Sequence, residues 1–222
     1  SSACSFTSFI GYEWTGMPQG QKIHRNVVFR NEKHQAVPTN FIDTPTAEGL
    51  WQALVAQCLD RGDGCDVIAI PHNSNVSNGE LFRIETSEGL PITARIAKRR
   101  SEIEVLVEVT QHKGDSECRR SDAPTADELC AFETPPGSTM REMMVPRLAK
   151  EAQPLSFVRE VLAEGLAQQA RIGENPFKPG LIGSTDTHFG TPGMVDEDRF
   201  VGHAACPVPQ FVSPPVLPHP FA

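Results

Sequence analysis

The sequence of 222 residues contains no apolar run near the roughly 18 residues that a membrane-spanning helix needs. It also lacks an excess of basic residues, because 20 Lys and Arg stand against 28 Asp and Glu, a net charge of −8. A general nucleic-acid-binding domain normally carries a basic face, so this charge argues against that class. No Cys-x-x-Cys pair occurs among the 6 cysteines, which excludes zinc-ribbon and thioredoxin-type sites. With 39% hydrophobic residues, global disorder is not expected either.

Length and end composition suggest one domain with a tail. At roughly 100–200 residues per domain, we expect residues 1–203 to form one domain and the Pro-rich stretch 204–222 to be a tail. The chain opens Ser1-Ser2-Ala3-Cys4 without Met or a signal-peptide pattern. Both ends therefore suggest cutting or processing, and we expect the chain to be part of a longer protein.

Two pairs of cysteines bracket short polar segments: Cys58 with Cys65, and Cys118 with Cys130. Two local disulfides would suit an oxidising compartment, which favours the periplasm or the outside of the cell. Unpaired thiols, some of them buried, are the alternative, because spacing does not show geometry.

Short apolar runs alternate with amphipathic helical patterns. Strands are predicted at 6–12, 23–29, 66–70, 103–110 and 181–185. Helices are predicted from the Thr44 cap to Gly62, at 126–132, and from the Ser156 cap to Gly173. Strands that alternate with helices predict an α/β fold with a mainly parallel sheet. The continuous apolar run at 66–70 is typical of a strand buried on both faces of such a sheet.

Most of these strands carry or precede a side chain that can bind a metal ion. The residues are Glu13, His24, His72, His112, Asp186 and His188. In an α/β barrel, reactive groups come from the carboxyl ends of different strands, and these residue types suit Zn, Mn or Fe. Taken singly, each has a simpler explanation: a histidine in a turn, an acid paired with a core arginine, an aspartate capping a turn. Together they predict one cluster that could hold two or three ions and produce a hydroxide near neutral pH.

Further polar residues lie beside these candidates. Asn73 offers donors and acceptors for a bound oxyanion, and Lys113 is a candidate anion contact, although both could belong to ordinary turns. Arg25 follows His24 and should point to the opposite face of the strand, so it is not expected to contact a substrate.

Five segments carry a family resemblance: FIGYEWT at 9–15, HRNVVF at 24–29, IPHN at 70–73, GDSEC at 114–118 and GSTDTH at 183–188. With them the chain resembles the PHP superfamily (polymerase and histidinol phosphatase), and is closest to its uncharacterised domain of unknown function 3604 branch. The resemblance implies a distorted TIM-like (β/α)7 barrel with a metal cluster at the carboxyl ends of its strands. It also implies a metal-dependent phosphoesterase that acts on a small phosphorylated substrate.

The resemblance also implies roles for single residues. Glu13 would bridge ions, His24 and His72 would each bind one ion, and Asp186 and His188 would complete the cluster. Within this set, the catalytic residues would be Glu13, His72 and Asp186. Four further residues would contact the substrate: Asn73, His112, Lys113 and Glu117. Of these, His112 and Glu117 are included because they match the sequence of this branch.

The sequence departs from the family in one motif. No His-x-His occurs in it, although the family carries one near its N-terminus. We therefore expect a C-terminal portion of the protein, with an incomplete barrel and a missing N-terminal segment as its partner. Two alternatives stay open: a non-catalytic, exported binding scaffold, and a sulfate-ester hydrolase that uses the same metal site.

Overall fold

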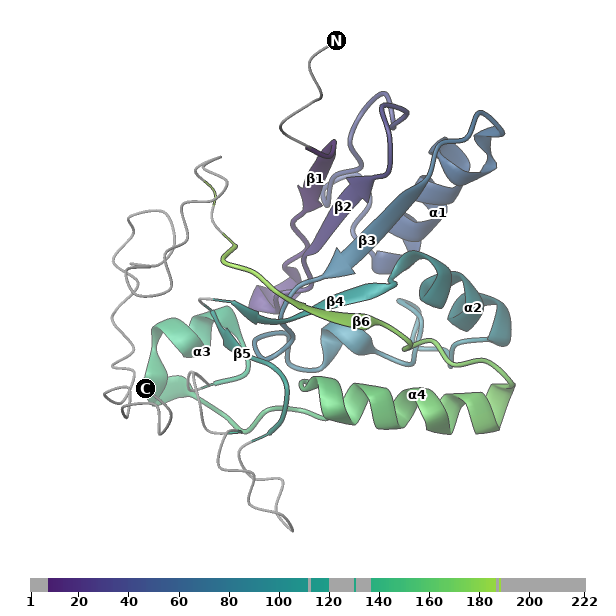
Figure 1. Ribbon diagram of the computed structural model, residues 1–222. Helices are drawn as coiled ribbons and strands as arrows, with labels where there is room; N and C mark the ends of the chain where they lie inside the picture. Colours follow the sequence, from purple (N-terminus) through teal and green to yellow (C-terminus); the bar gives the residue numbers. More distant parts are fainter. Residues whose placement is uncertain (1–7, 112, 120–129, 131–136, 187, 189–222) are drawn as a thin grey trace, which may run out of the picture.

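The structure, a computed structural model, describes residues 8–111, 113–119, 130, 137–186 and 188. These residues form a mixed α/β fold with two small sheets (Figure 1). The strands are β1 (Gly11–Trp14), β2 (Arg25–Phe29), β3 (Val67–Pro71), β4 (Leu106–Gln111), β5 (Gly114–Asp115) and β6 (Gly180–Gly183). The α-helices are α1 (Ala47–Gln57), α2 (Ala94–Ile103), α3 (Met140–Met144) and α4 (Val158–Ile172). Short 3-10 turns are η1 (Pro18–Gly20), η2 (Leu59–Arg61), η3 (Glu80–Phe82) and η5 (Pro146–Leu148).

The first sheet has the order β1-β2-β3 and is antiparallel throughout, so the expectation of a mainly parallel sheet is wrong here. The segment 30–46 carries the chain back along the sheet, because Thr46 at the start of α1 lines the same pocket as Arg25 at the start of β2. Helix α1 then returns the chain to the end of β2, and β3 starts opposite that end, with Val67 paired to Phe29. Strand β3 alternates buried and half-buried residues, so it is not buried on both faces as predicted.

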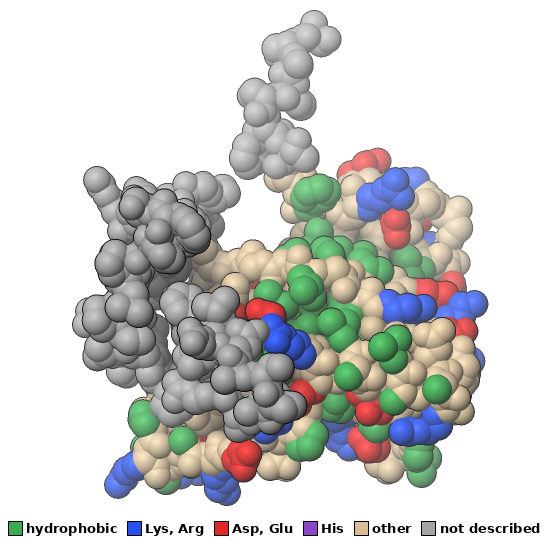
Figure 2. All heavy atoms as spheres, turned by 60° about the horizontal axis from the view of Figure 1, so that its bottom comes forward, with side chains coloured by type: hydrophobic (Ala, Val, Ile, Leu, Met, Phe, Trp, Pro, Cys, Tyr) green, Lys and Arg blue, Asp and Glu red, His purple; other side chains and the backbone are tan. Residues whose placement is uncertain are grey.

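The second sheet has the order β5-β4-β6 and contains a parallel pair, β4 with β6. Figure 1 shows β4 beside β3, and residues of the two strands lie in contact. Within the described residues the two sheets do not close into a barrel, and β1 and β6 are outer strands. Leu181 on β6 is 54% exposed, and Figure 2 shows hydrophobic side chains gathered in the middle of the face that it draws.

One hydrophobic core joins the first sheet to three helices and β4. Its fully buried members include Trp14 and Val27 from the sheet, Leu54 from α1, Ile103 from α2 and Val107 from β4. Side chains of this size each contribute about 1.5–3 kcal/mol when they leave water. This core holds the ends of β1, β2 and β3 in a fixed arrangement.

Helix boundaries differ from the predicted ones. Thr46, not Thr44, caps α1, because its Oγ1 accepts the N–H of Gly49 at 3.1 Å. Ser156 does not cap α4, which begins after Phe157 without a side-chain cap. Gly173 ends α4 with φ 80°, which confirms the predicted stop signal.

Some elements were not predicted, and some predictions cannot be compared with the structure. Helices α2 and α3 and strand β5 were not predicted from the sequence. Except for residue 130, the helix predicted at 126–132 lies outside the described residues, as do the domain boundary at 203 and the tail at 204–222. No helix in the described part of the chain is long and apolar enough to cross a membrane.

Both predicted cysteine pairs are disulfide-bonded. Cys58 and Cys65 join the end of α1 to the approach of β3, with Cα atoms 5.1 Å apart. Cys118 and Cys130 close a second local loop, with Cα atoms 5.2 Å apart. The alternative of unpaired thiols therefore does not apply to these four residues.

Candidate metal centre

Three predicted ligands meet at one edge of the first sheet. Glu13 lies on β1, His24 directly precedes β2, and His72 directly follows β3. The antiparallel register brings these places together, and the backbone N–H of His72 donates to the carbonyl of His24 at 3.1 Å. The three side chains each offer a ligand atom within 4.8 Å of the others. The ring centroids of the two histidines are 5.4 Å apart. This first group is therefore compact enough to hold one metal ion.

The two imidazoles of the first group are buried, with His24 5% and His72 1% exposed. His24 Nδ1 lies 2.8 Å from Oε1 of Glu13, which is a hydrogen-bond distance. The other three ring nitrogens, Nε2 of His24 and both nitrogens of His72, have no hydrogen-bond partner among the described residues. Leaving such a group buried and unsatisfied costs about 1–3 kcal/mol. These three unsatisfied nitrogens, side by side, are the feature that a metal ion would explain.

Charge at the first group also suits a metal ion. Burial lowers the pKa of His24 and lowers that of His72 to about 3, where the charge of Lys22 adds to the effect. Both rings are therefore neutral at pH 7, the state in which an imidazole nitrogen can bind a metal. Burial would raise the pKa of Glu13, but the hydrogen bond with His24 and the charge that the histidines carry in acid outweigh it, so the pKa is lowered to about 2 and the carboxylate is ionised at pH 7. Thr15 supports it, because its hydroxyl donates to Oε1 of Glu13 at 3.0 Å.

A second group shares Glu13 with the first. Asp186 and His188 follow β6, and both have a ligand atom within 4.8 Å of one on Glu13. Nε2 of His188 lies 3.4 Å from Oε2 of Glu13, whereas His24 approaches Oε1. The two oxygens of Glu13 thus face different groups, as in a carboxylate that bridges two cation positions. In the second group, however, Asp186 already forms an ion pair with Lys113.

Glu108 on β4 links the strand ends that carry these ligands. It is 2% exposed and accepts the backbone N–H of Asn73 at 3.1 Å. It also accepts the hydroxyl of Ser184, which directly follows β6. One buried carboxylate therefore ties the segment after β3, which contains His72, to the segment after β6, which contains Asp186.

Lys22 is a residue of the centre that the sequence analysis missed. It is completely buried, its Nζ donates to the side-chain oxygen of Asn73, and burial together with the nearby charge of Lys113 lowers its pKa to about 7. A signal was available, because residues two apart in an extended segment share a face, and Lys22 precedes His24 by two. Glu108 gave a weaker signal, as one polar residue within an apolar strand.

The predicted substrate contacts lie in different places. Asn73 is completely buried and its amide nitrogen donates to Asn75 and to the carbonyl of Gly114, so it positions the segment after β3 instead of facing an open pocket. Glu117 is not in either group and forms an ion pair with Arg159 at 2.6 Å. His112 lies outside the described residues.

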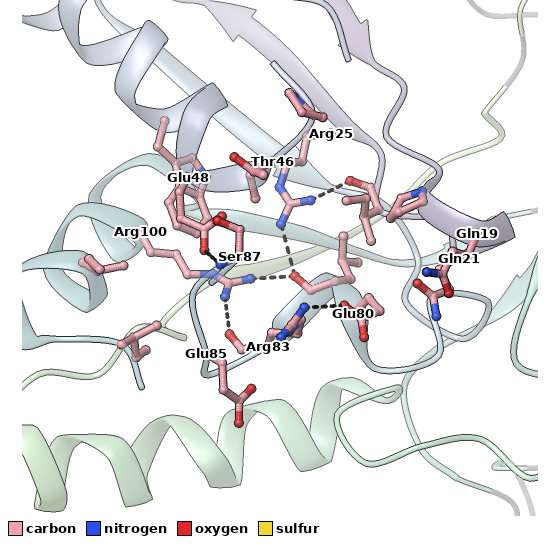
Figure 3. A pocket seen from close by; sticks show the side chains of 18 residues that line it. Gln19, Gln21, Arg25, Thr46, Glu48, Glu80, Arg83, Glu85, Ser87 and Arg100 are labelled. Atoms are coloured by element: carbon pink, nitrogen blue, oxygen red, sulfur yellow. Dashed lines mark hydrogen bonds and ion pairs between the residues drawn. The ribbon is translucent and has the colours of Figure 1, made fainter. Parts of the chain in front are cut away.

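Arg25 points away from the centre, as expected, and belongs to a second buried charge cluster. Its Nε donates to Glu104 at 2.7 Å, and Nε of Arg100 donates to the same carboxylate at 2.8 Å. Both guanidinium groups line a pocket of about 300 Å³ and both donate to the carbonyl of Leu81 (Figure 3). Trp51 adds a hydrogen bond to Glu104 at 3.0 Å. These charges are paired inside the protein, which is typical of a structural cluster.

Fold and site together define a mixed α/β protein with a candidate metal centre at the edge of an antiparallel sheet. A family model described as Protein of unknown function (DUF3604) matches residues 1–215, and the chain therefore belongs to this family. Comparison with curated proteins and with solved structures found no match.

Proposed function

We propose that this protein is a metal-dependent hydrolase whose ion site is built from Glu13, His24, His72, Asp186 and His188. One observation carries the proposal: His24 and His72 are buried together, and apart from the contact of His24 Nδ1 with Glu13 their ring nitrogens have no hydrogen-bond partner among the described residues. Imidazole and carboxylate ligands suit Zn, Mn or Fe. Such ions, when bound, lower the pKa of water and polarise the oxygen of an ester.

The chain's own residues would arrange this chemistry. Glu13 presents one oxygen to each group of ligands, and Glu108 fixes the two segments that carry His72 and Asp186. Lys22 is buried beside Asn73, and with a pKa lowered to about 7 it adds positive charge near the centre when it is protonated, which favours an anionic substrate. A small phosphate ester fits this charge best, and the resemblance to the PHP superfamily points to the same substrate class. A sulfate ester has the same geometry and becomes an outcome of the test.

The same proposal extends to the fold. The parallel pair β4–β6 and the position of β3 beside β4 support part of a PHP-type (β/α)7 barrel, whereas the antiparallel pairing in the first sheet departs from such a barrel. Further strands would then come from another segment of the same protein, which would cover the exposed Leu181. The disulfides favour an exported protein, because such bonds persist in oxidising compartments.

Metal content is the direct test. We expect the purified chain, loaded with Zn²⁺ or Mn²⁺ and desalted, to retain metal by mass spectrometry, and Glu13→Gln and His72→Ala to lose most of it. The control is His34→Ala, since His34 is exposed and lies outside both groups. Metal retention equal to wild type in both ligand variants would overturn the assignment.

Substrate class requires a second assay. Aryl phosphates and aryl sulfates should be compared on the metal-loaded chain, with Asp186→Asn as the inactive reference. Hydrolysis of the phosphates alone supports the proposal, and hydrolysis of the sulfates alone replaces the substrate class. Bound metal with no hydrolysis of either ester would favour the binding scaffold instead of the hydrolase.

A further inference from the structure

The two groups of candidate ligands differ in whether a positive charge is already present. In the first group, three of the four ring nitrogens of His24 and His72 have no hydrogen-bond partner among the described residues, and the fourth contacts the carboxylate of Glu13. In the second group, the Nζ of Lys113 forms an ion pair and a hydrogen bond with Oδ2 of Asp186. The Asp186 oxygen that would bind a metal ion is therefore already in contact with the ammonium of Lys113.

This ion pair is largely withdrawn from water. The Lys113 side chain is 13% and the Asp186 side chain 6% exposed. Buried ion pairs are screened much less than surface pairs, and separating one leaves two charges without partners. A metal ion at Asp186 would have to displace the ammonium and leave it close to a second cation.

The backbone keeps Lys113 at this place. Its carbonyl accepts a hydrogen bond from Nδ2 of Asn75 at 3.0 Å, and the next carbonyl, that of Gly114, accepts one from Asn73 at 3.3 Å. Both asparagines are buried in the segment that follows β3. The turn between β4 and β5 is thus attached to the same segment as His72, so the ammonium cannot leave the centre by a simple movement of the turn.

We propose that Lys113 takes the second cation position of the centre, so that the chain binds one divalent ion, at Glu13, His24 and His72. This inference rests on the proposed metal centre. It departs from the expectation of two or three ions, because the second positive charge is supplied by a side chain. One oxygen of Glu13 would then bind the metal ion, and the other faces the second group, in which the ammonium of Lys113 supplies the positive charge.

Metal stoichiometry tests the proposal without any measurement of activity. The wild-type chain, stripped with a chelator, is titrated with Zn²⁺ in a calorimeter, and bound zinc is measured after desalting. We expect one ion per chain in wild type and two in Lys113→Met, the second at least about tenfold weaker than the first. Lys113→Arg, which retains the charge, should bind one.

Two controls locate the second ion. Lys98→Met removes an exposed lysine of α2 and should bind one ion, as wild type does. The double variant Lys113→Met with Asp186→Asn should return from two ions to one, because Asp186 supplies the freed ligand. Circular dichroism and thermal unfolding check that each variant is folded.

The outcomes separate this inference from the proposed function. Two ions in the wild-type chain overturn the role of Lys113 without any variant and leave the metal centre in place. One ion in both wild type and folded Lys113→Met also overturns it. No bound zinc in wild type overturns the metal centre itself, and the inference with it.

Discussion

Acid should destabilise the metal-free protein through His72. Its pKa falls from 6.5 in an unfolded chain to about 3 in the folded protein, first because of burial and then because of the charge of Lys22. Between pH 6.5 and about pH 3, the ring of His72 is therefore protonated in the unfolded chain and neutral in the folded protein. Stability is complete above pH 6.5 and is lost as the pH falls toward 3, because a depressed folded pKa favours unfolding in acid.

The size of the effect follows from the shift. Each pH unit between the two pKa values costs about 1.4 kcal/mol of the free energy of unfolding. Near pH 6 the unfolded ring is only partly protonated, so the loss between pH 6 and pH 4 is about 2–3 kcal/mol. This loss is a large fraction of the roughly 5–15 kcal/mol that stabilises a typical domain.

Urea unfolding in the presence of a chelator measures this loss, with the fluorescence of the buried Trp14 and Trp51 as the probe. Carboxylates and His24 also titrate in this range. The useful quantity is therefore the difference between wild type and His72→Asn in the free energy of unfolding that is lost. We expect the variant to lose about 2–3 kcal/mol less than wild type between pH 6 and pH 4. The exposed His34 is the control, and His34→Asn should follow the wild-type curve. Parallel pH curves for wild type and His72→Asn would show that the fold does not exclude a proton from this ring, and would refute the reasoning.

Two further predictions concern the fold. Glu104→Gln should lower the free energy of unfolding by about 3–5 kcal/mol in urea, because it leaves buried guanidinium groups without a counter-charge. Two residues earlier, in the last turn of α2, Glu102→Gln should change the free energy of unfolding by less than about 0.5 kcal/mol, since that exposed side chain forms only a long surface pair; equal effects would contradict the distinction. Removal of the Cys58–Cys65 disulfide by a double alanine variant should cost about 2–3 kcal/mol, given the separation of 7 residues. A midpoint unchanged by reductant in the wild-type chain would contradict this last prediction.

The sequence indicated the candidate ligands, but it predicted parallel strands where the first sheet is antiparallel. Parallel strands were expected to bring their carboxyl ends together, and His24 directly precedes β2, so a parallel sheet would place it at the opposite edge from His72. The antiparallel register reverses β2 and pairs Arg25 with Pro71, so the two histidines become neighbours. Residue type and spacing indicated the candidates, while the register that joins them depends on the path of residues 30–46, which no local pattern reveals.

Helix α2 shows why other parts could not be predicted. Its buried positions are Ala97, Arg100 and Ile103, so an arginine occupies the middle of the face that packs on the core. Sequence patterning identifies amphipathic helices from apolar residues at helical spacing, and a buried charge interrupts that signal. Arg100 is acceptable there only because Glu104, four residues later, accepts its Nε, and Arg25 from β2 shares the same carboxylate. That compensation comes from tertiary contacts.

His24 and Arg25 are neighbours in the chain and both are buried, yet they lie in clusters of opposite character. Arg25 donates to a carboxylate and to the carbonyls of Ile23 and Leu81, so its charge is used within the protein. The ring of His24 contacts Glu13 through Nδ1, and it faces the ring of His72, whose two nitrogens have no hydrogen-bond partner among the described residues. Burying unsatisfied ring nitrogens costs stability, because apolar side chains of similar size would pack there at lower cost. The charges around Arg25 are therefore compensated within the protein, whereas the nitrogens left without partners around His24 are those that the proposed metal ion would bind.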